Sequence, residues 1–306
     1  MDIAIAVGDV RGPASAAEIT SQIRTAADAG FSSAWASQAF GWDPLVLLTA
    51  AGAIPGIGLG TAVLPVPQRH PLVLAGQALS VQAATGNRLT LGIGAGIATM
   101  VETAFGLPGD RPVHRMREYL TVLKPLLRGE TVDHHGDTIT AVGAAHVPGA
   151  TPPPVLLAAL GPAMLRLAGE LAEGTVTWMT GPKTLAGHIV PSITNAAAAA
   201  GRPAPRVVAG LLICVTDDEA AVRARVAGQF ALAGQVPEYR AMLDREGMTG
   251  PGDLVIAGDE DKVARRLDRL RDAGVTEFMA APYGTAEEQD RTTTVLAGMT
   301  SRRPNP

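Results

Sequence analysis

The sequence contains very little cysteine and no long apolar run. A single cysteine among 306 residues, Cys214, excludes an internal disulfide framework and a thiolate zinc cluster. No stretch reaches the roughly 18 uninterrupted apolar residues that a membrane-spanning helix needs. The first residues, MDIAIAVGDV, lack the basic start and the apolar segment of a signal peptide. We therefore expect a cytoplasmic protein without a membrane partner.

Charge of one sign is also scarce, because the formal net charge is only −4. This balance gives no reason to expect nucleic acid or an anionic membrane as a partner. Apolar residues make up 47% of the chain, which is too many for a disordered protein. A chain of this length can bury one large core. We expect a single domain over residues 1–306, with insertions near residues 129–149 and 232–252.

Short apolar segments alternate with helical patterns along the whole chain. Several of them are continuous apolar runs, as expected for parallel strands that are covered on both faces. The predicted strands are Asp2–Val7, Ser33–Ser37, Gly58–Leu64, Leu89–Gly94, Val155–Leu160, Thr175–Met179, Val207–Val215 and Glu277–Ala281. Eight strands that are each followed by a helix predict an α/β fold, the (β/α)8 TIM barrel. A doubly wound sheet, which has the same alternation but usually fewer strands, is the alternative.

Helix signals occupy the intervals between these strands. Ser15 and Glu18 form a capping box, and we expect a helix from there to Gly30. Pro71 suits the first position of a helix that continues over 72–84. Thr216 to Glu219 is a second candidate capping box, ahead of a helix over 220–229. Asp259 is expected to cap a helix over 262–273.

The stretch LGIGAG, residues 91–96, places three glycines at alternate positions. A dinucleotide-binding loop would follow the first strand and precede an acidic residue by about 20 positions, whereas this loop follows the fourth strand. At the carboxyl end of a barrel strand, glycine allows the backbone to approach a ligand closely. Packing glycines in a tight turn are the alternative. After the fifth strand, Gly161-Pro162 opens a helix whose free N–H groups suit an anion.

The side-chain sets of several other catalytic classes are missing from the sequence. None of the six histidines shows a metal-ligand spacing such as H-E-x-x-H, and we expect no metal site. Neither a G-x-S-x-G elbow nor a Walker sequence is present, so hydrolysis and phosphoryl transfer are not expected. A bound cofactor is therefore expected to carry the chemistry.

Seven motifs follow one another in a recognisable order between residues 2 and 281. They are AGFSSAW (29–35), GLGTAVLP (58–65), RHPL (69–72), GNRLTLGIG (86–94), AALGP (158–162), GDE (258–260) and DAGV (272–275). Together they resemble the bacterial luciferase-like superfamily of flavin and deazaflavin enzymes. More narrowly, they resemble its actinobacterial branch, which uses the deazaflavin coenzyme F420.

The resemblance implies a barrel in which a flavin-like ring lies at the carboxyl ends of the strands. The residues that match cofactor-binding segments of the family are Thr61, Ala62 and Val63 behind the ring, Ala95, Gly96 and Ile97 in the lining loop, and Ala158, Ala159, Leu160, Gly161 and Pro162 at the phosphate. Family members often have a non-proline cis peptide bond behind the ring, and we expect it between Ala62 and Val63. Coenzyme F420 is the expected cofactor, with FMN as the alternative.

The sequence departs from the family just after the second strand. Several F420 enzymes have an acidic residue and a histidine there, but this chain has Gln38 and Ala39. Ala39 transfers no proton and Gln38 only orients a substrate by hydrogen bonding. The departure argues against oxidation of an alcohol or a sugar phosphate and leaves reduction open, with Glu102 and His114 as candidate proton donors. Besides Gln38, the expected walls of the substrate pocket are Phe40, Trp42 and Trp178.

The expected function is an F420-dependent oxidoreductase, most simply a reductase in which F420H2 delivers hydride to a C=C or C=N bond of a small organic substrate. An FMN-dependent luciferase-like monooxygenase is the first alternative. A non-catalytic barrel that binds a ligand is the second, because the acid–base pair is missing at Gln38 and Ala39. The resemblance also implies a homodimer.

Overall fold

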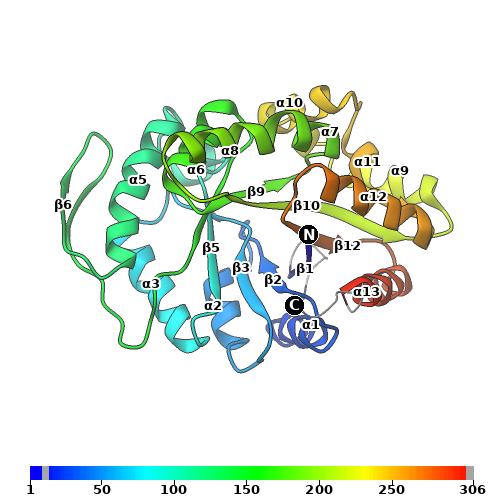
Figure 1. Ribbon diagram of the computed structural model, residues 1–306, viewed down its shortest axis with the longest axis horizontal. Helices are drawn as coiled ribbons and strands as arrows, with labels where there is room; N and C mark the ends of the chain where they lie inside the picture. The colour runs from blue at the N-terminus through cyan, green and yellow to red at the C-terminus, as the bar shows by residue number, and fades with distance from the viewer. Residues whose placement is uncertain (9–13, 301–306) are drawn as a thin grey trace.

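Eight parallel strands close into a barrel in the computed structural model, which describes residues 1–8 and 14–300 (Figure 1). Each strand pairs with the next, and β12 pairs with β1 to close the ring. The barrel strands are β1 (Asp2–Val7), β2 (Ser33–Ala36), β3 (Gly58–Thr61), β5 (Leu89–Gly94), β8 (Val155–Ala158), β9 (Gly174–Trp178), β10 (Arg206–Val215) and β12 (Glu277–Pro282). The predicted TIM barrel is confirmed, and the open doubly wound sheet is excluded because the sheet has no free edge in the ring.

One strand prediction needs correction, and one strand was not predicted. The run 58–64 was expected as one strand, but it is interrupted after Thr61 and resumes as β4 (Leu64–Pro65), which pairs with β5. A short strand that the periodicity did not reveal, β11 (Ile256–Gly258), lies parallel to β10 outside the ring. Three residues are too few to show an apolar period.

Helices surround the barrel (Figure 1). They are α1 (Ala16–Asp28), α2 (Pro44–Ala50), α3 (Pro71–Ala84), α4 (Ala98–Phe105), α5 (Pro112–Leu127), α6 (Pro162–Leu171), α7 (Pro182–Thr184), the π-helix η2 (Leu185–Ile189), α8 (Val190–Ala199), α9 (Glu219–Gln229), the 3-10 helix η3 (Ala233–Gln235), α10 (Pro237–Glu246), α11 (Pro251–Leu254), α12 (Glu260–Asp272) and α13 (Ala286–Thr300). Among the described residues, no helix has both the length and the apolar character that crossing a bilayer requires.

The helix starts follow local capping chemistry, with one correction. The capping box of Ser15 and Glu18 is formed in both directions, and Asp259 accepts a hydrogen bond from Lys262 N at the start of α12. At α9, the expected cap at Thr216 is wrong: Asp218 caps the helix by accepting from Ala221 N. Thr216 instead donates from its hydroxyl to Glu288, a contact that local sequence does not specify.

Both expected insertions carry secondary structure of their own. Strands β6 (Val132–His135) and β7 (Thr140–Gly143) form an antiparallel hairpin within the 129–149 segment, and Figure 1 shows it extending beyond α5 at the edge of the molecule. The segment 232–252 contains η3, α10 and the start of α11. The single domain over 1–306 stays a prediction, and its last six residues lie outside the described part of the chain.

The barrel interior is filled at its middle by large side chains. Trp35, Leu156 and Met279 belong to one buried cluster that faces the barrel axis, distinct from the larger cluster between the strands and the helices. A Cβ at Gly60 would lie 2.3 Å from the Trp35 ring, so the glycine makes room for this tryptophan. The middle of the barrel is therefore a packed core rather than a channel.

The amino-terminal end of the interior is closed by a polar network around Glu277. Ser33 and Trp35 donate to Glu277 Oε1 from the second strand, and Arg206 Nη2 donates to Oε2 over 2.8 Å. The Glu277 side chain is only 6% exposed. A buried carboxylate is tolerated here because it is both paired with a charge and hydrogen-bonded.

Candidate functional site

At the opposite, carboxyl end, the barrel interior is lined by small residues. Gly94 ends β5, and a Cβ there would lie 3.3 Å from Ala158 Cβ and 3.0 Å from Val63 Cγ2. Ala62 and Val63 are half-buried and pack on the interior cluster that contains Trp35. We call Ala62, Val63, Gly94 and Ala158 the barrel floor. Ala62, Val63 and Ala158 are half-buried, so this end of the interior presents short apolar side chains against which a planar ring could pack.

The expected cis peptide bond is confirmed between Ala62 and Val63. The residue before it, Thr61, is fully buried. Its hydroxyl donates to Gly92 O over 2.7 Å and accepts from Gly92 N over 2.9 Å. Thr61 therefore joins β3 to β5, and of the three residues predicted behind the ring only Ala62 and Val63 lie at the barrel floor.

The glycines of LGIGAG serve different purposes. A Cβ at Gly92 would lie 1.9 Å from Thr61 O, so this glycine is required by the neighbouring strand. Gly96 has a φ of +75°, a conformation that disfavours other residues. Ala95, Gly96 and Ile97 are partly or fully exposed beyond the end of β5, and Ile97 is the N-cap of α4. Packing accounts for Gly92, while residues 95–97 are free to line a ligand.

The turn from β8 into α6 has the form expected of an anion site. Pro162 is the first residue of α6 and Gly161 its N-cap, which provides no side-chain cap. The first N–H groups of the helix are therefore available to a ligand. Nothing lies within 4 Å of a Cβ at Gly161. His188 Nε2 lies 2.8 Å from Leu160 O and holds this turn from the other side.

The predicted aromatic walls fall into two sets. Phe40, after β2, is 69% exposed, and its ring centroid lies 6.4 Å from that of Phe105 at the end of α4. Trp178 packs inside the barrel, where its ring lies 2.7 Å from a Cβ placed at Gly210. Trp42 Nε1 donates to Ala14 O over 2.9 Å and so fastens the loop after β2 to the segment before α1.

Gln38 lies in a polar network that the sequence did not reveal. Arg69 Nη2 donates to Gln38 Oε1 over 2.9 Å and to Asp43 Oδ2 over 2.8 Å, and Nη1 donates to Gln77 Oε1 over 3.1 Å. Asp43 also caps α2 by accepting from Leu45 N. Arg69 was visible only as part of the motif RHPL; Asp43 and Gln38 lie 26 and 31 positions earlier in the chain, and Gln77 lies 8 positions later.

The two candidate proton donors lie apart from this network. Glu102 is exposed on α4, and its Oε1 would lie 2.9 Å from a Cβ at Gly109. His114, on α5, has Nε2 at 3.4 Å from Glu118 Oε1 and at 3.2 Å from Asp137 Oδ2 in the hairpin. The structure thus brings His114 to the β6–β7 hairpin.

The group of His114, Glu118 and Asp137 has the spacing of a metal site, since one ligand atom from each lies within 4.8 Å of the others. The Glu118 carboxylate, however, already accepts from Asp137 N, Ile139 N, Thr138 N and the Thr138 hydroxyl. Burial raises the pKa of Glu118, but the bonds from Thr138 and Asp137 and the nearby His114 outweigh it and bring it to about 2. We interpret the group as a fastening of the hairpin to α5.

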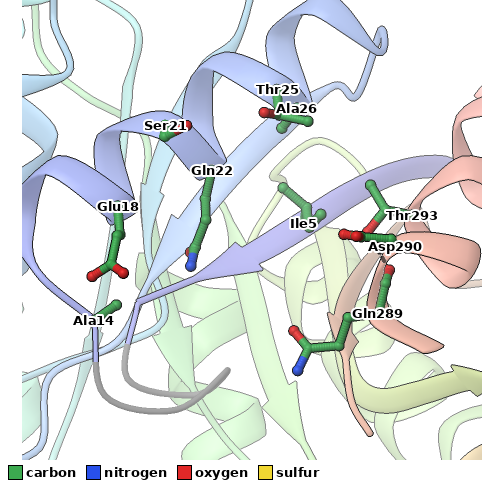
Figure 2. Close-up of a pocket in the computed structure, with 10 residues that line it drawn as sticks. All are labelled: Ile5, Ala14, Glu18, Ser21, Gln22, Thr25, Ala26, Gln289, Asp290 and Thr293. Carbon is green, nitrogen blue, oxygen red and sulfur yellow. Dashed lines mark hydrogen bonds between the residues drawn. The ribbon is translucent and has the colours of Figure 1, made fainter. Parts of the chain in front are cut away.

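Away from the barrel floor, a polar pocket lies between α1 and α13 (Figure 2). Glu18, Ser21 and Gln22 come from α1, and Asp290 and Thr293 come from α13. None of the residues predicted for the cofactor or the substrate lines this pocket. Both the sequence motifs and the geometry indicate the barrel floor, and not this pocket, as the candidate site.

Comparison with known proteins supplies the family. The family model of luciferase-like monooxygenases matches residues 3–277. The 5,10-methylenetetrahydromethanopterin reductase of Methanolobus tindarius is 29% identical over 262 residues, which cover 76% of this chain and 80% of that protein.

Two solved structures share the fold over nearly the whole chain. The coenzyme F420 dependent tetrahydromethanopterin reductase of Methanopyrus kandleri has a TM-score of 0.82 at 23% identity, covering 97% of each chain. The oxygenating constituent of 3,6-diketocamphane monooxygenase from Pseudomonas putida, in complex with FMN, has a TM-score of 0.78 at 17% identity, covering 100% of this chain and 99% of that one.

Proposed function

The chain belongs to the luciferase-like monooxygenase family of oxidoreductases, and from this premise we propose that it is an F420-dependent oxidoreductase. The reaction we propose is reduction of a C=C or C=N bond in a small organic molecule. When bound, F420H2 supplies the hydride from its deazaflavin ring. The observation that carries the proposal is the barrel floor, where Ala62, Val63, Gly94 and Ala158 leave an apolar seat at the carboxyl ends of the strands.

The choice of F420 over FMN rests on the relatives. The reductase from Methanopyrus kandleri is named as F420-dependent, and the matching methylenetetrahydromethanopterin reductases catalyse reductions by name. In this chain, residues 95–97, which are half-buried or exposed, and the N–H groups at the start of α6 are the groups that would hold the rest of the cofactor.

Reduction fits the side chains at the end of β2 better than oxidation does. Oxidation of an alcohol needs a base that accepts the hydroxyl proton. In the described loop after β2, Gln38 has no basic group and Ala39 has no polar side chain. A reduction needs only a proton, which solvent supplies. The exposed rings of Phe40 and Phe105, 6.4 Å apart, are the apolar groups that we expect to cover a bound substrate.

Separate titrations with F420 and with FMN test the proposal. We expect F420 to bind, with quenching of its fluorescence, and F420H2 to be oxidised without consumption of oxygen when an acceptor substrate is present. Preferential binding of FMN, with oxygen consumed by the reduced flavin, would instead favour the monooxygenase that the Pseudomonas neighbour exemplifies. Binding of neither cofactor would favour the non-catalytic barrel.

The homodimer that the family resemblance implies is part of the proposal. Light scattering of the purified protein measures the mass directly. A mass near twice the 31.4 kDa of the chain is the expected result, and a mass of one chain would contradict it.

A further inference from the structure

Gln38 lies in the loop that leaves β2 beside the barrel floor. It follows Ala36 by two residues, and the carbonyl of Ala36 accepts a hydrogen bond from Ala62 N. Ala62 is itself part of the floor. The loop that carries Gln38 therefore begins next to the seat of a bound ring.

Arg69 determines which end of this amide is free. A guanidinium has only donors, so the atom of Gln38 that faces Arg69 Nη2 at 2.9 Å must be the carbonyl oxygen. The amide nitrogen then points elsewhere. It has no hydrogen-bond partner among the described residues, and it is not one of the enclosed polar atoms without a partner. Within the described part of the chain, Gln38 thus has two N–H donors that no other group uses.

The guanidinium itself is held firmly. The side chain of Arg69 is 11% exposed, and its other acceptors are Asp43 and Gln77. Its Nε is enclosed without an acceptor. Rotation away from these partners would leave further buried donors unsatisfied, which is costly. Arg69 therefore keeps the amide of Gln38 in one orientation.

The surroundings of the amide favour a neutral ligand with a hydrogen-bond acceptor. Phe40 is the second residue after Gln38 and contacts Phe105, so one side of the site is apolar. The guanidinium of Arg69 behind the amide is paired with the Asp43 carboxylate, so the two charges offset each other. The discrimination therefore comes from the N–H donor itself, which needs an acceptor atom that an iminium cation does not have.

We propose that Gln38, positioned by Arg69, donates an N–H to the carbonyl oxygen of an apolar α,β-unsaturated ketone, and that neutral enones rather than cationic iminium ions are the substrate class. The inference rests on the proposed reductase function. Hydride adds to the β-carbon, and the C=C electron pair moves toward the carbonyl to give an enolate oxygen, which Gln38 stabilises. Solvent then protonates the α-carbon. The ketone gains two electrons, and F420H2 is oxidised to F420 with release of one proton.

The test compares two probes with F420H2 as reductant: 2-cyclohexenone and the N-methyl-3,4-dihydroisoquinolinium cation, whose C=N carbon accepts hydride but whose nitrogen has no free lone pair. Gln38→Leu should lower kcat/KM for cyclohexenone by about tenfold or more, since one lost oxyanion donor typically costs at least that much. Turnover of the cation should change by less than about twofold. Gln38→Glu keeps the contact with Arg69 but has no donor, and should behave like Gln38→Leu.

Gln235→Leu, which makes the same substitution at an exposed glutamine of η3 outside this network, is the matched control. It should leave the turnover of both probes unchanged. An equal loss with both probes for Gln38→Leu would show a structural role only and would overturn the inference. Reduction of the cation alone by the wild-type protein would refute the enone assignment while the reductase function stands. Reduction of neither probe, despite F420 binding, would remove the reductase function and the inference with it.

Discussion

The two ends of the barrel interior have opposite chemistry. At the amino-terminal end, Glu277 is buried and hydrogen-bonded by Ser33, Trp35 and Arg206. At the carboxyl end, the interior finishes in the short side chains of Ala62 and Ala158. The first end is closed by groups that satisfy one another, so it has no capacity left for a ligand. The second end has apolar surface without bulk, and it is the end where a ligand can be seated.

This difference indicates that the residues that stabilise the barrel and the residues that can bind a ligand lie at opposite ends of its axis. A fully paired polar network in a low-dielectric interior stabilises one arrangement, because each group would be costly to leave alone. Small residues contribute little burial but leave space. Changes at the two ends should therefore have different consequences, and substitutions can test the separation.

The largest effect is expected from Glu277→Ala at the closed end. The substitution leaves Arg206, Trp35 and Ser33 without their shared acceptor, so the free energy of unfolding should fall by about 3–5 kcal/mol. Urea denaturation measures this loss. Glu287→Ala, at an exposed carboxylate of α13, is the control and should change stability by less than about 0.5 kcal/mol. A similarly small loss for Glu277→Ala would contradict the structural role of the network.

Gly92→Ala tests the layer between the two ends. The new methyl group would lie 1.9 Å from Thr61 O, and a backbone atom in a strand cannot easily move away. We expect a loss of about 3 kcal/mol in the free energy of unfolding. Gly76→Ala is the matched control in α3, where nothing lies within 4 Å of the added carbon, and it should stabilise by about 0.5–1 kcal/mol. Equal effects of the two variants would show that β3 and β5 do not approach so closely.

At the open end, Ala158→Leu should reduce binding without reducing stability. The larger side chain enters the barrel floor rather than the packed core, so it competes with a seated ring. The Kd for F420 should rise by about tenfold or more, equivalent to at least ~1.4 kcal/mol, while the melting temperature stays within about 2 °C. Ala198→Leu, at an exposed position of α8, is the control for added size. Unchanged affinity for F420 would place the cofactor elsewhere.

The smallest effect concerns pH at the amino-terminal end. Burial raises the pKa of Glu173, but hydrogen bonds from Lys124, Val155 and Arg202 and the charge of Lys124 overcome this and hold it below its usual value of 4.5. A lowered carboxyl pKa gives stability that is present above the ordinary pKa and is lost as pH falls through the folded one. Glu173→Gln should cost about 1 kcal/mol at neutral pH.

Unfolding curves between neutral pH and pH 3 check this sign. The difference between wild type and Glu173→Gln should shrink as the pH falls below about 4.5. A difference that grows toward acid would mean that the pKa of Glu173 is raised in the folded protein.

Most of the barrel could be predicted from local patterns. Continuous apolar runs located all eight ring strands to within two residues, apart from the interruption after Thr61. Where a helix began with chemistry contained in its own first turn, as at Ser15 and Asp259, the start was also predicted correctly. Thr216 was misassigned because its hydroxyl bonds to Glu288, far away in the chain.

The candidate site was predictable only in part. Family motifs indicated the positions of the barrel floor and the turn into α6, and the cis bond was placed correctly. They did not indicate that Thr61 is buried between strands or that Gln38 depends on Arg69. These contacts join loops that belong to different strands, so no spacing along the chain encodes them.

By itself, the sequence determined the repeating order of strands and helices, the starts of most helices and the membership of a barrel family, because apolar period, caps and motifs act over a few neighbouring residues. Only closure of the ring decided that the amino-terminal end of the interior is filled by a polar network and that the carboxyl end is lined by short apolar side chains. It brings Glu277 of the last ring strand to Ser33 and Trp35 of the second, and it sets Ala62, Gly94 and Ala158 side by side. The physical reason is that the polar network of Glu277 and the barrel floor are each made by residues from different strands. These residues meet only when the strands have packed together.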